Sequence, residues 1–489
     1  MIQRLFKQAG RNKLHWDKPQ TPAVQELPIP PRLVFTLPQE MNERSLLVSQ
    51  GSYVLKGQAL TRSDCYLNPP LHATSSGYIS AISKRHLFLE PDHTDAGIPL
   101  QPPSPVLTRA DLIDVAHHAG LRGHGGAGYP VAAKLQSLSN HAELLLVNAA
   151  ECDPAIHCDD GLMLDRTTKV IEAIVRISSC CTLRRTVIGI EDNKVNAIKA
   201  LRTELKRRGD CAAIELITVP SQYPSGAERL LLQKCTGRTV DPELRPSEQG
   251  ILSMNVATCY ALGEIINTAM PCTDRITTVV TVDKQLYNYR VRLGTPLSHL
   301  LQATVNTRHS KAENISVSVG GYMMGEPVSL QESVTQSTNC LIVNSKDIPA
   351  SASHPCIRCG ACSDICPENL MPQNLYTHSV QFDPGELDNL KIHRCIECRS
   401  CDVVCPSDIA LTSHFQHAKA QIESHKHAEA NAALAKRRYE KRLQRLAEAG
   451  DKNCKKRTPR AIEPKAPEHS RKALIEAALK RSLEKKSGN

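Results

Sequence analysis

Eight cysteines toward the C-terminal end of the chain form two copies of one pattern, C-x2-C-x2-C-x3-C-P. The first copy ends at Pro367 and the second at Pro406. This doubled spacing holds two [4Fe–4S] clusters, and the fourth cysteine of each run ligates the cluster of the other run. The pattern therefore predicts a module with two clusters, whose chemistry is the transfer of single electrons.

The crossing of the two runs predicts which cysteines share a cluster. Three thiolates wrap around one cluster, and the fourth begins a helix that reaches the other. The predicted set of cluster 1 is Cys356, Cys359, Cys362 and Cys405, and that of cluster 2 is Cys395, Cys398, Cys401 and Cys366. Structural zinc is one alternative, but it leaves the third thiolate and the proline unexplained. Disulfides are another, and they suit small secreted domains.

A second candidate site is the glycine-rich loop GLRGHGGAGYP at 120–130. Its glycines let backbone amides approach a ligand and adopt positive φ. A helix is expected to follow, with its N-terminus directed at a phosphate. The loop matches neither the dinucleotide fingerprint nor the P-loop. By general rules it indicates a nucleotide or flavin phosphate site, and a mobile loop is the alternative.

The elements around this loop predict an α/β domain. Leu144–Glu151 and Thr186–Asp192 each read as a buried strand with an acidic end, and Ile214–Pro220 reads as another strand. Asn193–Gly209 has the pattern of an amphipathic helix. Strand, helix and strand at this spacing favour a parallel sheet. Short apolar pieces separated by glycine predict β structure at Gly51–Ile82, and a smaller β segment is expected at about 275–343.

Composition limits the class of protein. The chain has 489 residues, of which 41% are hydrophobic and 3% aromatic, which leaves room for roughly two to four domains. Its first residues lack the apolar core of a signal peptide, and no apolar run is as long as a membrane span. Nineteen cysteines fit a reducing compartment. We therefore expect a cytoplasmic chain that is soluble or peripheral to a membrane.

Positive charge is concentrated in the last part of the chain. Residues 416–489 hold 20 Lys and Arg against 9 Asp and Glu, a net charge of +11, whereas the whole chain carries +10. Such a segment binds anionic lipid, nucleic acid or an acidic partner, or is a solvated linker. No recognition motif for nucleic acid accompanies the charge. We expect two exposed helices or a disordered tail, and docking to a membrane or a partner.

Several stretches resemble one family. GLRGHGGAGYPVAAK (120–134) resembles the flavin-mononucleotide loop of NADH-binding flavoprotein subunits, such as that of complex I. Four more stretches resemble the C subunit of the Rnf (Rsx) electron transport complex: VNAAECDPAIHCDDGLM (147–163), YPSGAERLLLQKCTGR (223–238), GILSMNVATCYAL (250–262) and GGYMMGEPV (320–328). The similarity runs from about 45 to 415. Two predicted clusters favour the Rnf protein, because the complex I flavoprotein has one.

The resemblance implies a function and its partners. Members of the Rnf family are peripheral subunits that pass electrons between NAD(H), FMN and two [4Fe–4S] clusters on the cytoplasmic side of the bacterial inner membrane. Their partners are the other subunits of the complex, including integral membrane subunits and a ferredoxin-like subunit, and the complex is a translocase. The alternative is a soluble NADH-linked subunit of a hydrogenase or dehydrogenase. A third possibility is a two-cluster domain fused to a non-catalytic scaffold.

The family motifs also imply which residues hold the nucleotides. The expected FMN and NAD(H) contacts come from the glycine loop, the end of the first strand and the two following motifs. They are Gly123, Gly125, Gly126, Gly128, Tyr129, Lys134, Asn148, Glu151, Asp153, Asp160, Gly226, Glu228 and Asn255. Hydride transfer needs no general acid or base from the protein, so no catalytic residue is expected.

The expected fold class is a multidomain α/β protein. Its parts are an irregular N-terminal segment (1–45), a lipoyl-like β domain (46–100), an FMN/NADH-binding α/β domain like that of the complex I flavoprotein (101–274), a small β-grasp insert (275–345), a helical ferredoxin-type module with two [4Fe–4S] clusters (346–415) and a charged basic tail (416–489). The resemblance supplies the lipoyl-like, β-grasp and FMN/NADH assignments.

Overall fold

The computed structural model describes most of the chain. The described residues are 7–8, 14–15, 18–37, 45–63, 65–100, 108–209, 213–241, 243–304, 315–345, 353–455 and 471–484. The chain divides into two units, residues 1–420 and 421–489. We describe each unit by itself.

A four-stranded antiparallel sheet of order β4-β7-β6-β5 forms the β domain near the N-terminus. Its strands are β4 (Leu33–Thr36), β5 (Tyr53–Val54), β6 (Gly77–Ile82) and β7 (His86–Pro91). Leu33, Ile79, Leu87 and Leu89 are fully buried in its core. A Cβ on Gly77 would lie 2.0 Å from the carbonyl oxygen of Glu90, so only glycine fits there.

The N-terminal segment expected to be irregular supplies strands to two sheets. β4 pairs with β7, while β3 (Val24–Glu26) pairs in parallel with β13 (Leu286–Arg292). A further ladder joins β1 (Lys7–Gln8) and β2 (Leu14–His15). The sequence did not predict these strands, because they are short and lie near prolines. Edge strands tolerate proline, so its presence does not exclude a strand.

The α/β domain has the predicted parallel sheet, in the order β10-β9-β8-β11. The strands are β8 (Leu144–Ala149), β9 (Arg185–Glu191), β10 (Ile214–Val219) and β11 (Ile251–Asn255). Its helices are α1 (Arg109–His118), α2 (Val131–Gln136), α3 (Cys158–Asp165), α4 (Thr167–Cys180), α5 (Val195–Arg207), α6 (Glu228–Thr236) and α7 (Val256–Thr268).

Helices cover both faces of this sheet. Leu145 and Val147 point into a core with α1 to α5 and α7, whereas Leu144 and Leu146 pack against α6 on the other face. Both faces are therefore buried, which explains the continuous apolar run in the β8 sequence. The carboxyl ends of the strands lie at one edge, where ligands bind in open α/β sheets.

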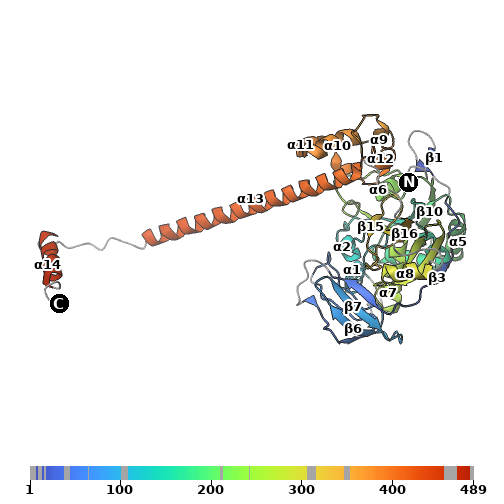
Figure 1. Cartoon of the computed structure of the whole chain (residues 1–489), viewed down its shortest axis with the longest axis horizontal. Coiled ribbons are helices and arrows are strands. Elements are labelled where there is room, and N and C mark those ends of the chain that lie inside the picture. The colour runs from blue at the N-terminus through green and yellow to red at the C-terminus, as the bar shows by residue number, and fades with distance from the viewer. Residues whose placement is uncertain are drawn as a thin grey trace. The chain divides into compact units, whose positions relative to one another are not determined.

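A six-stranded sheet of order β15-β14-β16-β12-β13-β3 follows. Its remaining strands are β12 (Asp274–Val280), β14 (Ile315–Val319), β15 (Glu326–Val328) and β16 (Cys340–Ser345), and α8 (Leu297–Thr304) packs on it. Next come the short helices α9 (Ala361–Asp364), α10 (Pro372–Gln381), α11 (Pro384–Asn389) and α12 (Ser400–Val403), together with the 3-10 turn Ile392–Arg394. Figure 1 shows the four helices gathered in one group.

The long helix α13 (Leu411–Lys455) begins in the first unit and continues through the second. Its first turns are anchored, because Leu411, Phe415 and Ala418 are buried. From 423 to 446 every residue is exposed. A second helix, α14 (Arg471–Glu484), lies in the same unit. The tail is thus helical in its described residues.

Candidate functional site

A cavity of about 720 Å³ lies at the carboxyl edge of the parallel sheet. It is lined by the glycine loop, the residues after β8, the 319–328 stretch of the six-stranded sheet, and Ile396 and Cys398 of the cysteine module. A neighbouring cavity of about 470 Å³ shares Gly125, Asn148 and Asn255 with it. Together they have the size of a site for a small-molecule cofactor.

The glycine loop contributes backbone rather than side chains to both cavities. Gly126 and Gly128 have φ values of 98° and 61°, which glycine adopts without strain. Gly125 faces Asn255, whose Cβ would lie 3.3 Å from a Cβ added at Gly125. Tyr129 lines the smaller cavity, and the guanidinium of Arg245 stacks 4.7 Å from its ring centre. The predicted loop residues therefore surround one space.

Asn148 and Gly226 line both the large and the smaller cavity. The Asn148 amide donates a hydrogen bond of 2.8 Å to the carbonyl of Gly226. A Cβ on Gly226 would lie 2.5 Å from the carbonyl oxygen of Ala150, so the two chain segments touch backbone to backbone. Lys134 and Glu228 both line the smaller cavity and form an ion pair of 2.9 Å with each other.

Glu151 lines the large cavity and organises a buried ion cluster at its wall. Its carboxylate accepts hydrogen bonds from the backbone amides of Asp159 (2.6 Å) and Asp160 (3.1 Å), and so caps the start of α3. Lys194 lies 3.3 Å from Glu151 and 3.2 Å from Asp160. Although burial opposes it, the ammonium groups of Lys194 and Lys18 lower the pKa of Glu151 to about 2. Asp160, predicted as a nucleotide contact, faces Lys194 and is not among the cavity-lining residues.

Replacing Lys194 by Met is expected to destabilise the α/β domain by about 3 to 5 kcal/mol, because two buried carboxylates lose their partner. Urea unfolding at neutral pH measures this. The low pKa of Glu151 stabilises the fold above about pH 4.5, and this contribution is lost as the pH falls toward 2. The matched control is Lys169→Met, whose half-exposed pair with Glu264 (2.8 Å) should contribute less than about 1 kcal/mol. Equal losses in the two variants would contradict the expectation.

Asp153 fixes the loop that connects the cavity to the cysteine module. Its carboxylate accepts backbone hydrogen bonds from Tyr322 (3.1 Å) and Met323 (2.9 Å). A Cβ on Gly321 would lie 2.1 Å from this carboxyl group. The carbonyl of Gly325, in the same loop, accepts a hydrogen bond of 3.2 Å from Arg399. Asp153 thus positions the module against the cavity.

Asp159 was not predicted, although it lines the large cavity. Its carboxylate accepts a hydrogen bond from the side chain of Asn255. Burial, reinforced by the neighbouring charge of Glu151, raises the pKa of Asp159 to about 7. The only signal in the sequence is its place in the Cys-Asp-Asp run that begins α3. The carboxyl group can therefore change its protonation near neutral pH.

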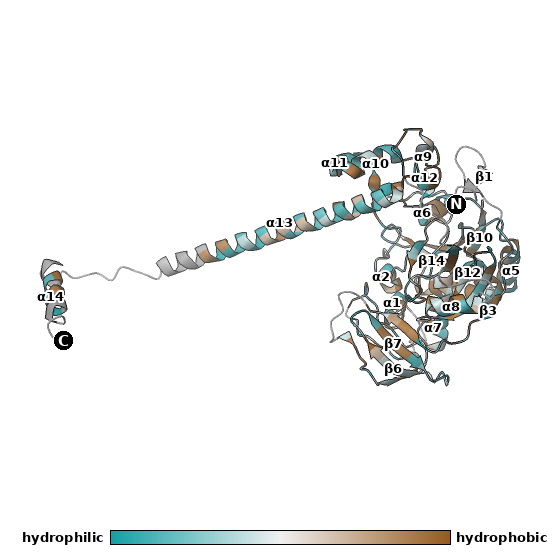
Figure 2. Ribbon diagram, in the orientation of Figure 1, coloured by the Kyte–Doolittle hydropathy of each residue, from teal (hydrophilic) through white to brown (hydrophobic). Residues whose placement is uncertain are grey.

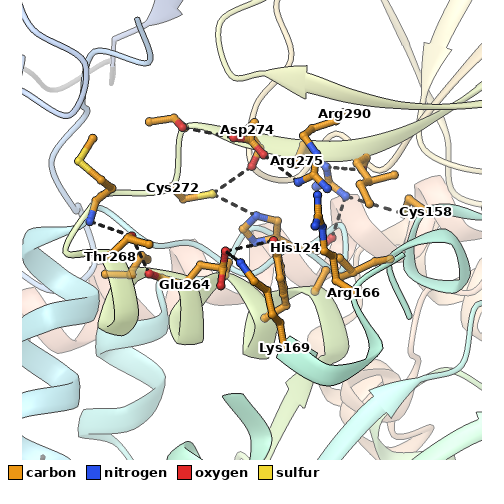
Figure 3. Close-up of a pocket in the computed structure, with 18 of the residues that line it drawn as sticks. His124, Cys158, Arg166, Lys169, Glu264, Thr268, Cys272, Asp274, Arg275 and Arg290 are labelled. Carbon is orange, nitrogen blue, oxygen red and sulfur yellow. Dashed lines mark hydrogen bonds and ion pairs between the residues drawn. The ribbon is translucent and has the colours of Figure 1, made fainter. Parts of the chain in front are cut away.

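Asp159 also lines a third cavity, of about 370 Å³. His124 and Cys158 belong to the wall between this third cavity and the large one. Figure 3 shows the third cavity, where Cys272 lies 3.5 Å from His124 and Lys169 pairs with Glu264 at 2.8 Å. Burial lowers the pKa of His124 to about 3, so the imidazole is neutral. Carboxylates and cations both line this cavity, and their balance selects no class of ligand.

Asp159→Asn is expected to stabilise the fold more at pH 8 than at pH 5. The raised pKa means that the native protein holds a proton that the unfolded chain has lost, so the stability of the wild type falls as the pH rises from about 4 to 7. The amide removes this cost, with an expected gain of up to about 4 kcal/mol at pH 8. Urea unfolding at both pH values measures it. Glu264→Gln, in the third cavity, is the control. The same gain in that variant would contradict the assignment of the pH-dependent loss of stability to Asp159.

Each predicted cysteine set lines its own small hollow. Cys356, Cys359, Cys362 and Cys405 line one. Cys366, Cys395, Cys398 and Cys401 line the other. Each hollow is therefore lined by three cysteines of one run and the fourth of the other. Burial raises the pKa of Cys395 to about 11, so that loading of iron must displace a proton from this thiol. Four sulfur donors around a small hollow fit the ligand set of a [4Fe–4S] cluster.

Tyr223 lies between the large cavity and the second hollow, which is the one lined by Cys398 and its set. It was not predicted as a site residue. It lines the large cavity, and its hydroxyl donates a hydrogen bond of 2.8 Å to the carbonyl of Cys398. Its ring is buried in a small apolar cluster with Met323, Cys152 and Cys398. Cys398 itself lines both the cavity and the hollow. The two sites are therefore contiguous.

Three family models match the chain. The Nuo51 FMN-binding domain matches residues 116–264, the RnfC barrel sandwich hybrid domain residues 13–97, and the 4Fe-4S dicluster domain residues 355–410. Each matched range contains the features expected of its type: the glycine loop and the parallel sheet, the antiparallel β domain, and the two cysteine hollows. FMN and iron–sulfur clusters are the cofactors of these domain types, and the residues present fit them.

Whole-chain relatives decide the family. The chain is 36% identical over 482 residues to the C subunit of the ion-translocating oxidoreductase complex of Salmonella enteritidis PT4, covering 95% of this chain and 67% of that one. The chain belongs to the RnfC family. It is 37% identical over 487 residues to the corresponding protein of Edwardsiella ictaluri (95% of this chain, 59% of the relative) and 40% identical over 413 residues to that of Pasteurella multocida (81% and 49%).

This RnfC-family chain spans about half to two thirds of the length of these relatives. Among solved structures, an NAD+-reducing [NiFe]-hydrogenase in the H2-reduced state aligns with a TM-score of 0.46 at 17% identity, covering 64% of this chain and 63% of that one. Within the described residues of this RnfC-family chain, no helix has the length and apolar character needed to cross a membrane.

Proposed function

We propose that this chain exchanges electrons between NAD(H), FMN and two [4Fe–4S] clusters as a subunit of a membrane-bound oxidoreductase complex. FMN, when bound, accepts two electrons together and passes them on one at a time. It can therefore link a nicotinamide, which gives two electrons at once, to iron–sulfur clusters, which take one each. The observation that carries the proposal is that Cys398 lines both the large cavity and the second cysteine hollow. Two sites that share a residue suit electron transfer.

The residues present support named roles. Backbone amides of Gly125, Gly126 and Gly128 would hold the FMN phosphate, with Lys134 as its counter-charge. The amide of Gly123 donates to the carbonyl of Tyr129 (2.9 Å), so Gly123 would shape the loop. Asn148, Asn255 and Asp159 line the cavity where polar edges of the flavin would be bound. We assign Glu228, Gly226 and Tyr129 to the nucleotides as well. Glu151 and Asp153 also line this cavity, where they could contact the nucleotides. Glu151 accepts hydrogen bonds from the first amides of α3, and Asp153 holds the 320–325 loop. Asp160 stands behind them, paired with Lys194.

The cysteine sets suggest an order. Cluster 2, held by Cys366, Cys395, Cys398 and Cys401, would lie next to the cavity. Cluster 1, held by Cys356, Cys359, Cys362 and Cys405, would be the outer one, since Cys356 and Cys359 are exposed. An exposed cluster suits exchange with a partner protein. We therefore propose the order NAD(H), FMN, cluster 2, cluster 1 and partner.

We also propose the finer assignments implied by the family. The partners are integral membrane subunits and a ferredoxin-like subunit, and the complex as a whole is an ion translocase on the cytoplasmic side of the inner membrane. The names of the relatives, which describe an ion-translocating oxidoreductase complex, support the translocase part of this proposal. Within the chain we propose boundaries at 100, 274, 345 and 415, with a β-grasp fold for 275–345 and a charged tail after 415. The boundary expected at 45 moves toward the N-terminus, because β4 (Leu33–Thr36) belongs to the sheet of the β domain. The packing of α8 against the six-stranded sheet supports the β-grasp assignment.

Anaerobic purification followed by assays of iron, sulfide and flavin tests the cofactor content. We expect about eight iron and eight sulfide per chain, as two [4Fe–4S] clusters require, and about one FMN. Zinc in place of iron, or a chain that holds iron but takes up no flavin when FMN is supplied, would contradict the proposal.

A further inference from the structure

The second unit carries an exposed apolar stripe along α13. It consists of Ala432, Ala435, Tyr439, Leu443 and Leu446, spaced three and four residues apart. Residues at this spacing lie on one face of a helix. Tyr439, Leu443 and Leu446 are 62%, 48% and 59% exposed. Figure 2 shows hydrophobic residues recurring along α13 among hydrophilic ones.

Positive charge surrounds this stripe. Residues 436–445 contain one acid, Glu440, and six basic residues: Lys436, Arg437, Arg438, Lys441, Arg442 and Arg445. At 100° per residue, Lys436 and Arg442 stand about 60° to either side of Tyr439, at the two borders of the stripe. Their long aliphatic stems can run along an apolar surface while their charges stay in water.

We propose that residues 432–446 of α13 bind an anionic lipid surface, with the apolar stripe inserted among the headgroups. A narrow apolar face flanked by Lys and Arg is the composition of helices that lie in a membrane interface. Anionic headgroups complement the six cations. This inference does not depend on the proposed electron path, because it uses no residue of the cofactor sites.

Association with a second copy of the helix fits less well. A paired helix would place the same six cations beside one another, and like charges that close repel. The stripe offers only three large side chains to such an interface, which is little apolar area for a stable dimer. An acidic partner protein would satisfy the charges, and the test below separates it from lipid.

The test is flotation of the purified full chain with vesicles of phosphatidylcholine, with and without phosphatidylglycerol. We expect the chain to float with the anionic vesicles, to stay unbound with neutral ones, and to dissociate at high salt. Failure to float with anionic vesicles, or equal binding to both kinds, would overturn the proposal, and failure would point to a protein partner instead.

Two matched variants locate the binding face. Leu443→Glu places a charge in the stripe and should lower partition into anionic vesicles about tenfold or more. Leu434 is 47% exposed, nearly the same as Leu443, but lies on the opposite side of α13. Leu434→Glu adds the same charge there and should change partition by no more than about twofold. Iron content and helicity verify that both variants fold. Equal effects of the two substitutions would overturn the proposal.

Discussion

A Cys398→Ala protein is expected to keep its flavin and one cluster, and to lose electron exchange between that cluster and NAD(H). Cys398 lines both the large cavity and the second hollow, so its loss removes the cluster nearest the cavity. Iron should fall from about eight to about four per chain. The flavin should still respond to NADH. Anaerobic spectra of the flavin and of the remaining cluster measure both.

Cys359→Ala is the companion variant, since it removes a ligand of the outer set. It too should halve the iron, but its remaining cluster should exchange electrons with NAD(H) as in the wild type. Cys65 is exposed and far from both runs in sequence, so Cys65→Ala should change neither iron nor exchange. If Cys398→Ala kept the exchange and Cys359→Ala lost it, the proposed order of the clusters would be reversed.

A Gly226→Val protein is expected to lose FMN while retaining its iron. The added Cβ would lie 2.5 Å from the carbonyl of Ala150, so the segment must move away and break the hydrogen bond from Asn148. Both residues line the large cavity. We expect flavin affinity to fall at least about hundredfold, as loss of a buried close contact costs several kcal/mol. Flavin fluorescence titration of the deflavinated protein measures it.

The control for this substitution is Gly209→Val. Gly209 is exposed, and no heavy atom lies within 4 Å of a Cβ built on it. The same change of side chain should therefore leave flavin affinity within about twofold of the wild type. If the Gly226→Val protein bound FMN with normal affinity, the cavity wall at Gly226 and Asn148 would not be part of the flavin site.

The patterns that predicted most are those with a fixed spacing. The two cysteine runs predicted the crossed sets that line the hollows, because three ligands two residues apart leave little freedom to the backbone. The apolar runs at Leu144–Glu151 and Thr186–Asp192 predicted two buried strands, and the structure has them as β8 and β9, which pair in parallel. The local sequence predicts a feature when that feature depends mainly on the local geometry of the backbone.

Contacts between distant segments could not be predicted. Lys194 stands 43 residues from Glu151 in sequence, and its partnership makes Glu151 and Asp160 part of a buried ion cluster. Asp159 and Asp160 are adjacent acids with the same local pattern, yet one lines the cavity and the other faces Lys194. The start of α3 decides between them, since neighbouring helical residues point in directions about 100° apart. Tyr223 likewise needs the module folded against the cavity before its contact with Cys398 exists.

Electron exchange in both directions, measured on the anaerobic wild-type protein, decides whether the nicotinamide and the clusters are connected through this chain. NADH is added to the oxidised protein, and NAD+ to protein whose clusters have been reduced with dithionite and then freed of it. Flavin and cluster absorbance are followed together. NADH is expected to bleach the flavin, and the clusters are expected to change oxidation state in at least one of the two experiments. Clusters that respond to neither nucleotide, in protein that holds FMN and about eight iron, would contradict this connection.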